Sequence, residues 1–323
     1  DFHPYSWALF WREKAHSYLG QPIQRDKIHQ VEQMVARGRS DAVILWHTKT
    51  AVGARACFGG RMDDLLAWKA AAEESSRRLG KIFWFECWVS HSYVYGKLGA
   101  FDFEGLGEHI QRLFQSPDPY QVRLGHLFSG RLALARGRTD DALKALATFD
   151  RLECTEGRDN SYAEGLIYLG WCHLARGEIE QAEDYGRRGL ELATEGIYEN
   201  PLLALQFESI LGMVALERGE FDEAQQRFQR SLDQAAEDHN IIQQGFAEVR
   251  LGLLASKRED SEAAQAHFNA ARQHFTAIDN HGALRNLAAL IEQLERPSDD
   301  QPLIRPIVPV ISATTVVLEE STD

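Results

Sequence analysis

The stretch LGMVALERGEFDEAQQRF, Leu211–Phe228, decides the fold of this chain because its spacing recurs along the sequence. Its first glycine, Gly212, has counterparts at Gly130, Gly170 and Gly252, which are separated by 40, 42 and 40 residues. In all four units an alanine follows the glycine by 12 positions, and in three units an Arg-Gly pair follows by six and seven positions. A fixed period of this length indicates stacked structural repeats.

Each unit predicts two amphipathic helices joined by a tight turn. The turn lies at the Arg-Gly pair, where glycine supplies the backbone freedom that a helix end needs; the fourth unit carries Arg258-Glu259 there instead. The first glycine falls inside the first helix, where glycine costs about 1 kcal/mol relative to alanine. We therefore expect a close approach, in which this glycine faces the alanine of the second helix, while Phe228 and Phe268 fill the space between successive units.

The pattern resembles the tetratricopeptide repeat, in which Leu-Gly in the first helix is followed by Ala-x-x-x-Phe in the second. Leu211-Gly212, Ala224 and Phe228 match this pattern most closely. The units are longer than the family's usual length of about 34 residues, and they resemble the longer repeats of bacterial signal-dependent regulators. The resemblance covers residues 118–276 well and residues 40–117 more weakly. It implies an all-α fold, a right-handed superhelical array of antiparallel helix pairs.

The domain organisation follows from extending the repeat phase in both directions. We predict six helical hairpins over residues 40–276, preceded by a capping helix pair over residues 1–39. Residues 277–296 predict a C-terminal capping helix, since the ends of a solenoid need a polar cover. Residues 297–323 carry prolines and acidic residues, and they predict an extended tail. This tail is either a linker to another domain or a segment that folds back on the array or adds a strand to a partner.

Charge and hydropathy exclude two classes of partner. The net charge of −13 argues against a nucleic-acid-binding surface. Residues 1–160 hold 22 Lys+Arg and 20 Asp+Glu, whereas residues 161–323 hold 13 and 28. The acidic half is expected to be a solvated surface that biases charged partners. We expect no membrane contact, because no stretch approaches the roughly 18 apolar residues that a membrane helix needs.

The cysteines indicate a reducing compartment. Four of them, Cys57, Cys87, Cys154 and Cys172, are too few and too scattered for a disulfide scaffold. They are expected to be small buried side chains of a cytoplasmic protein. Because the sequence starts at Asp1 rather than methionine, we expect a processed product or a piece of a longer chain.

Motifs that carry catalysis are absent from the sequence. It holds no Gly-x-x-x-x-Gly-Lys-Ser/Thr, His-Glu-x-x-His or Gly-x-Ser-x-Gly motif. His267, His274 and His281 step by seven, whereas metal ligation on a helix needs a spacing of three or four. Asp140-Asp141 stand where a second helix begins, and there they suit the helix dipole. We therefore expect no enzyme activity, no cofactor and no metal site.

Aromatic residues are concentrated near the N-terminus. Six of the seven tryptophans lie in the first 90 residues, and residues 83–95 predict one helix with aromatic side chains on nearly every face. This composition is consistent with core packing between irregular units. The alternative is an aromatic-lined pocket or groove for a peptide or small ligand.

Candidate binding residues follow from the resemblance. The first helices of such an array line its concave side, and the family's concave positions lie six before, three before, one after and five after the first-helix glycine. Arg250 is taken on the same face, although it falls out of strict phase. The resulting candidates are His47, Thr50, Glu86, Tyr93, Lys97, Leu127, Arg131, Glu164, Trp171, Gln206, Met213, Arg250 and Lys257.

Three functions remain open from the sequence. The leading hypothesis is a non-catalytic scaffold or sensor domain that binds a protein or peptide, as the regulatory part of a bacterial signalling or transcription-control protein. The alternative is a small-molecule sensor with its ligand in the Trp- and Tyr-rich N-terminal half. The third is an enzyme with an unrecognised site. The sequence leaves open whether the chain forms a homo-oligomer.

Overall fold

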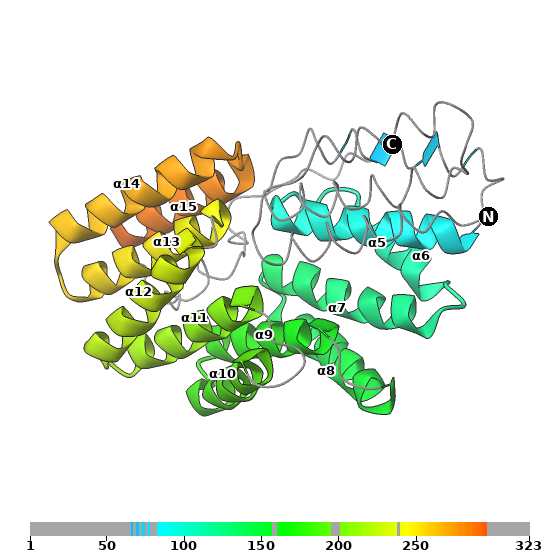
Figure 1. The fold of residues 1–323 in the computed structure, drawn as a ribbon, viewed down its shortest axis with the longest axis horizontal. Coiled ribbons are helices and arrows are strands. Elements are labelled where there is room, and N and C mark those ends of the chain that lie inside the picture. Colours follow the sequence, from blue (N-terminus) through cyan, green and yellow to red (C-terminus); the bar gives the residue numbers. More distant parts are fainter. Residues whose placement is uncertain are drawn as a thin grey trace.

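The computed structural model describes residues 83–156, 160–194, 201–237 and 240–295, together with six single residues between 66 and 77. The predicted capping pair 1–39, most of the first predicted hairpin and the tail 297–323 lie outside the described residues. The described part is all-helical, with eleven helices and no strand (Figure 1). They are α5 (Phe83–Gly99), α6 (Leu106–Phe114), α7 (Pro119–Ala135), α8 (Thr139–Glu156), α9 (Asn160–Ala175), α10 (Ile179–Thr194), α11 (Pro201–Glu217), α12 (Phe221–Glu237), α13 (Ile241–Lys257), α14 (Ser261–Ala277) and α15 (His281–Glu295).

Consecutive helices pack in pairs, and the pairs stack around a curve (Figure 1). Each repeated glycine lies in the first helix of a pair, so the four units of the sequence are the pairs α7–α8, α9–α10, α11–α12 and α13–α14. The first helices α5, α7, α9, α11 and α13 contact one another in succession. They form the inner layer of the array, and the second helices form the outer layer. The predicted all-α solenoid is confirmed.

The turns between paired helices share one hydrogen-bond pattern. After α11, the Gly219 N–H donates to the Leu216 carbonyl at 3.1 Å, and the Glu220 N–H donates to the Ala215 carbonyl at 2.9 Å. This pattern needs a left-handed residue at the centre of the turn, and Gly219 has φ 77°. The same pattern closes the fourth unit around Glu259, which adopts φ 62° without being glycine.

The repeated glycine faces a large side chain rather than the alanine that the sequence led us to expect. A Cβ atom at Gly212 would lie 2.8 Å from Cδ1 of Phe228 in the same hairpin, and one at Gly252 would lie 2.5 Å from Phe268. The predicted glycine-to-alanine contact was therefore wrong, and the two phenylalanines lie against the glycine of their own unit. In three of the four units the glycine makes room for the residue sixteen positions later, which locks the two helices of that unit together. At Gly170 a Cβ atom would instead meet Ile210 of α11.

The repeated turn arginine links each unit to the preceding one. Arg176 donates to Asp140 at 2.5 Å, Arg218 to Glu183 at 2.6 Å and Arg258 to Asp222 at 2.7 Å. The first of the four arginines reaches the backbone carbonyl of Phe103 instead. This common role explains why arginine recurs at a fixed position before the turn.

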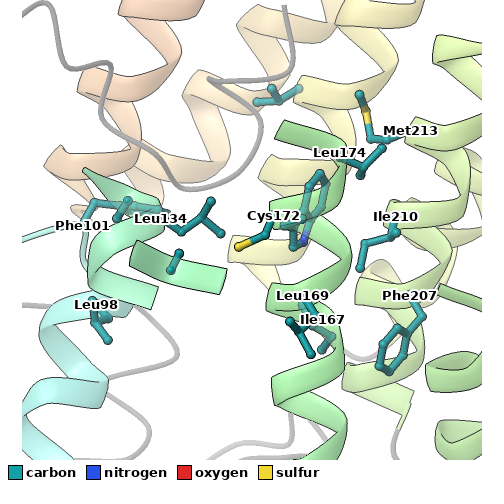
Figure 2. Packing of buried hydrophobic residues seen from close by; sticks show 14 of the residues in the cluster. Leu98, Phe101, Leu134, Ile167, Leu169, Cys172, Leu174, Phe207, Ile210 and Met213 are labelled. Atoms are coloured by element: carbon teal, nitrogen blue, oxygen red, sulfur yellow. The ribbon is translucent and has the colours of Figure 1, made fainter. Parts of the chain in front are cut away.

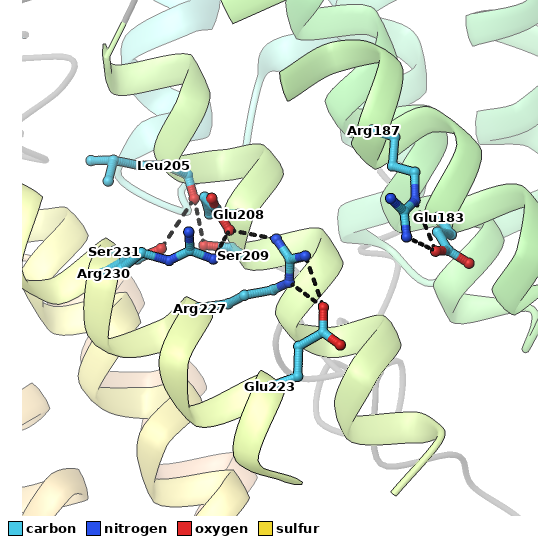
Figure 3. Close-up of polar contacts among 9 residues, drawn as sticks. All are labelled: Glu183, Arg187, Leu205, Glu208, Ser209, Glu223, Arg227, Arg230 and Ser231. Atoms are coloured by element: carbon cyan, nitrogen blue, oxygen red, sulfur yellow. Dashed lines mark hydrogen bonds and ion pairs between the residues drawn. The ribbon is translucent and has the colours of Figure 1, made fainter. Parts of the chain in front are cut away.

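Further ion pairs join helices within a unit. Figure 3 shows Arg227 of α12 between Glu208 of α11 and Glu223, at 2.8 Å from each carboxylate. Arg187 pairs with Glu183 along α10 in the same way. Because most of these pairs are exposed, they fix orientation more than they stabilise the fold.

One continuous hydrophobic core runs through the described helices. Its largest fully buried side chains include Phe149, Phe207, Phe228 and Phe275. Figure 2 shows part of this core, from Leu98 of α5, past Cys172 of α9, to Met213 of α11. The two described cysteines, Cys87 and Cys172, are buried free thiols.

Candidate ligand-binding face

The inner layer holds most of the predicted binding residues, and several of them are buried. The positions directly after the repeated glycines carry Arg131 on α7, Trp171 on α9 and Met213 on α11. Arg131 is half-buried, whereas Trp171 and Met213 are 2% and 0% exposed. The same register on successive first helices places these side chains on one face.

Arg131 lies between two tyrosine rings. Its guanidinium carbon is 4.9 Å from the ring centre of Tyr95 on α5 and 4.7 Å from that of Tyr168 on α9. The Tyr95 hydroxyl donates a hydrogen bond to the carboxylate of Glu164. Burial lowers the pKa of Arg131, but Tyr168, Tyr95 and Glu164 outweigh it, so that the pKa is raised. The structure therefore brings together two predicted residues, Arg131 and Glu164.

Arg250 and Trp171, two further predicted residues, also meet. The Arg250 guanidinium on α13 lies 5.7 Å from the Trp171 ring and 5.9 Å from the ring of Phe246, one helical turn earlier. Arg250 is 3% exposed, and its Nε atom finds no hydrogen-bond acceptor within the described parts of the chain. Burial lowers the pKa of its guanidinium to about 9.

These contacts form a row of aromatic and arginine side chains across four first helices, α5, α7, α9 and α13. We call it the arginine–aromatic row, because Tyr168 and Trp171 stand three positions apart on α9 and so connect its two halves. Four members are half-buried and two are buried beneath them. The row consists of Tyr95, Arg131, Tyr168, Trp171, Arg250 and Phe246.

Three members of the row, Tyr95, Tyr168 and Phe246, were missed from the sequence. Tyr168 stands two positions before its glycine, as Arg250 does, so that offset would have found it. Phe246 stands six positions before its glycine, the offset that yielded Glu164. Tyr95 lies in a unit without the glycine, where the register carries no clear signal.

The row ends where the array closes on itself. Phe101, which follows α5, packs edge-on against Phe246 at 5.7 Å. Asn280, which caps α15, donates to the Gly99 carbonyl at 3.4 Å. A Cβ atom at Gly282 would collide with the Ala100 carbonyl. These contacts, which we call the closure, join parts of the chain about 180 residues apart, and the repeat pattern carried no sign of them.

The predicted residues of α5 form a separate cluster. Lys97 lies 5.7 Å from the Tyr93 ring and pairs with Asp102 at 3.1 Å. The His109 ring packs against Tyr93 at 4.7 Å with the planes tilted by 59°, and its Nδ1 atom lies 3.1 Å from Ser90 Oγ. Burial, reinforced by Lys69, Arg112 and Lys97, lowers the pKa of His109 to about 4.

The remaining predicted residues do not join the row. Glu86 and Gln206 are half-buried, and none of the contacts found between described residues links them, or Met213, to the row. Leu127 is buried in the core, and Lys257 is exposed at the end of α13. His47 and Thr50 lie outside the described residues.

The described residues offer little for catalysis or metal binding. Among them, no group of three or more His, Cys, Asp or Glu side chains is placed to hold a metal ion. Ser90 and His109 are a nucleophile and a base within hydrogen-bond distance, but Ser90 is 0% exposed and also accepts from Arg112. No described helix combines the length and the apolar character needed to cross a membrane.

Comparisons with known proteins agree with this architecture. Tetratricopeptide-repeat family models match residues 129–197 and 205–230, whereas no curated protein matches the sequence significantly. The apo form of RapI has a similar fold, with a TM-score of 0.51 and 11% identity over 78% of this chain and 72% of that chain. BtubC (BKLC) from P. vanneervenii aligns with a TM-score of 0.49 and 17% identity over 68% of this chain and 92% of that chain. NprR in complex with its cognate peptide NprX aligns with a TM-score of 0.43 and 16% identity over 76% and 74%. Residues 129–197 and 205–230 therefore match tetratricopeptide repeats, and they lie within a larger set of described helices.

Proposed function

We propose that this chain is a non-catalytic scaffold or sensor that binds a peptide or protein segment along the arginine–aromatic row. The observation that carries this proposal is the row itself, since arginine and large aromatic side chains alternate across the inner layer. Arginine, tryptophan and tyrosine are the residues that dominate protein recognition energetically. A regulatory role in a bacterial-type cytoplasmic signalling or transcription-control protein follows from the resemblance of the long repeats.

The exposure of the row suits an extended partner. Tyr95, Arg131, Tyr168 and Phe246 are half-buried, so each keeps a surface that a ligand can cover. Neighbouring arginines hold the rings of Tyr95, Tyr168 and Phe246 in place, which reduces the entropy lost on binding. Since the four side chains come from four helices, a ligand that covers them must be several residues long.

A selection from a random peptide display library tests the proposal. The intact chain is expected to enrich a peptide family, and the Arg131→Met, Tyr168→Leu double variant is expected to lose at least tenfold in affinity for it. An Arg187→Met variant on the outer layer, where Arg187 is exposed, serves as the matched control. Circular dichroism and urea unfolding first establish that all three proteins are folded.

Two outcomes would contradict the proposal. Equal binding by the intact chain and the double variant would move the site away from the row. No enrichment with the intact chain would favour the small-molecule sensor, which a screen of metabolites by tryptophan fluorescence would then detect.

A further inference from the structure

The two arginines of the row differ in how their charge is balanced. Arg131 lies near the Glu164 carboxylate, which balances its charge, and near the Tyr95 and Tyr168 hydroxyls, although its Nη1 atom has no hydrogen-bond partner among the described residues. Arg250 is more deeply buried, and no charged group among the described residues acts on it. Its Nε atom has no acceptor there either. A buried cation without a partner opposes folding, so a residue of this kind calls for an explanation other than stability.

Resting on the proposed function, we propose that Arg250 is the anchor for a carboxylate of the ligand, a carboxylate that adjoins an apolar group. The guanidinium is planar, and its Nε atom with one Nη atom matches the two oxygens of a carboxylate. The rings of Trp171 and Phe246 flank this position, and they offer a surface to the apolar group.

A single negative charge fits this position better than a phosphate. Among the described residues no second lysine or arginine acts on Arg250. A ligand therefore has one positive charge to neutralise at this position. A carboxylate supplies one negative charge and two acceptor oxygens, whereas a phosphate carries more charge and requires further donors. The row therefore fixes the orientation of the ligand. Its carboxylate lies at the Arg250 end, and its neutral part lies towards Arg131.

The closure controls access to this anchor. Phe246 touches both Arg250 and Phe101, and Phe101 holds a left-handed φ of 54°. A bulky residue in that conformation is strained and persists only where surrounding contacts hold it. The ligand therefore reaches Arg250 when Phe101 moves off Phe246, and Phe101→Gly is expected to ease binding because glycine suits this φ and removes the ring.

A role in packing alone makes the opposite predictions. If Arg250 only joined α9 to α13 through its ring contacts, Arg250→Met would weaken the fold and leave ligand binding intact. If Arg250 is an anchor, Arg250→Met removes an unpaired buried charge, so the melting temperature rises while carboxylate binding is lost.

The test titrates N-acetyl-L-phenylalanine into the full chain, with N-acetyl-L-phenylalanine amide as the neutral match. Binding is followed by the ¹⁵N signal of the Arg250 Nε–H group, assigned by its loss in Arg250→Met, and by calorimetry. The acid is expected to shift this signal at millimolar concentration and the amide is not. Arg250→Met is expected to abolish the heat of binding, and Arg272→Met on the outer layer is expected to retain it. Phe101→Gly is expected to raise the affinity at least threefold. No shift with the acid, or equal heats for Arg250→Met and Arg272→Met, would overturn the proposal.

A second arm identifies the source of the carboxylate. Peptides from the display selection are compared as free acids, as C-terminal amides and with each Asp or Glu replaced by Asn or Gln. If one replacement lowers the affinity of the intact chain at least tenfold but does not lower that of Arg250→Met, the carboxylate belongs to the peptide. If the selected peptides bind equally in every form and to Arg250→Met, the anchor is refuted while peptide binding stands. If no peptide binds but the acid shifts Arg250, peptide binding fails and the anchor belongs to a small organic acid.

Discussion

The ring of Phe228 occupies the space beside Gly212 in which any other residue would place its Cβ atom, which would lie 2.8 Å from Cδ1 and 3.1 Å from Cζ. The same relationship holds between Gly252 and Phe268 and, with leucine as the large side chain, between Gly130 and Leu146. It explains why a residue that weakens helices recurs at one register. The glycine lets the second helix place a large apolar side chain directly on the backbone of the first.

Replacing Gly212 by alanine is therefore expected to weaken the fold. Overpacking of a close-packed core costs about 1–3 kcal/mol, which the better helix propensity of alanine offsets by about 1 kcal/mol. Urea unfolding should report a net loss of up to about 2 kcal/mol, and the Phe228→Leu variant should tolerate the alanine better than the wild type does. Gly107→Ala is the control, since a Cβ atom there meets nothing within 4 Å. A loss of the same size at Gly107, or strict additivity with Phe228→Leu, would contradict this account.

The fourth turn is expected to gain stability from Glu259→Gly. Glu259 holds φ 62° where the other three turns carry glycine, and a left-handed non-glycine residue costs about 1–2 kcal/mol. Part of this gain is lost to the greater freedom of glycine in the unfolded chain, so an increase of about 0.5–1 kcal/mol is expected. Thermal unfolding measures it. The reciprocal change Gly219→Ala, at φ 77°, should lower stability; a gain there would show that backbone conformation does not limit these turns.

The stability of the chain should fall as the pH drops from about 6.5 to 4, partly because of His109. Burial and three neighbouring cations lower its pKa from 6.5 to about 4. Over this interval the unfolded state binds more protons than the folded state, and stability therefore decreases on acidification. His109 contributes about 1 kcal/mol to this loss, because solvent screens its partly exposed imidazole. Urea unfolding at pH 7 and pH 4 should show that His109→Asn loses less stability than the wild type, and an identical loss in both proteins would contradict the assignment.

The two described cysteines should resist alkylation in the folded protein. Burial raises the pKa of Cys172 to about 12 and also raises that of Cys87, so little reactive thiolate exists at pH 8. Iodoacetamide labelling followed by peptide mass spectrometry is expected to modify both residues slowly in buffer and rapidly in urea. Rapid labelling of Cys172 in buffer would show that the α9 region opens readily, and the buried core described around it would then be wrong.

Much of the fold was predictable from residues whose roles are local. The spacing of Gly130, Gly170, Gly212 and Gly252 predicted the helix pairs, because amphipathic periodicity and turn glycines act over a few residues. The partner of each glycine was not predictable in the same way. Alanine and phenylalanine both stand on the inner face of the second helix, and the relative rotation of the two helices decides which of them meets the glycine.

The candidate site was predicted only in part. Arg131, Glu164 and Trp171 were found by counting from a glycine, and Arg250 was taken on the same face out of strict phase; the structure joins them in two pairs. Tyr95 was not found, since its helix lacks the glycine that sets the register.

The sequence by itself determined an all-α array and the position of the turns, because each depends on spacing within one or two neighbouring repeats. Only the tertiary structure decided that Arg250 is buried without a partner, and that Phe101 and Asn280 close the array onto its other end. These properties depend on the accumulated curvature of many repeats. A small rotation at each interface adds up along the stack and brings together residues that no local pattern connects.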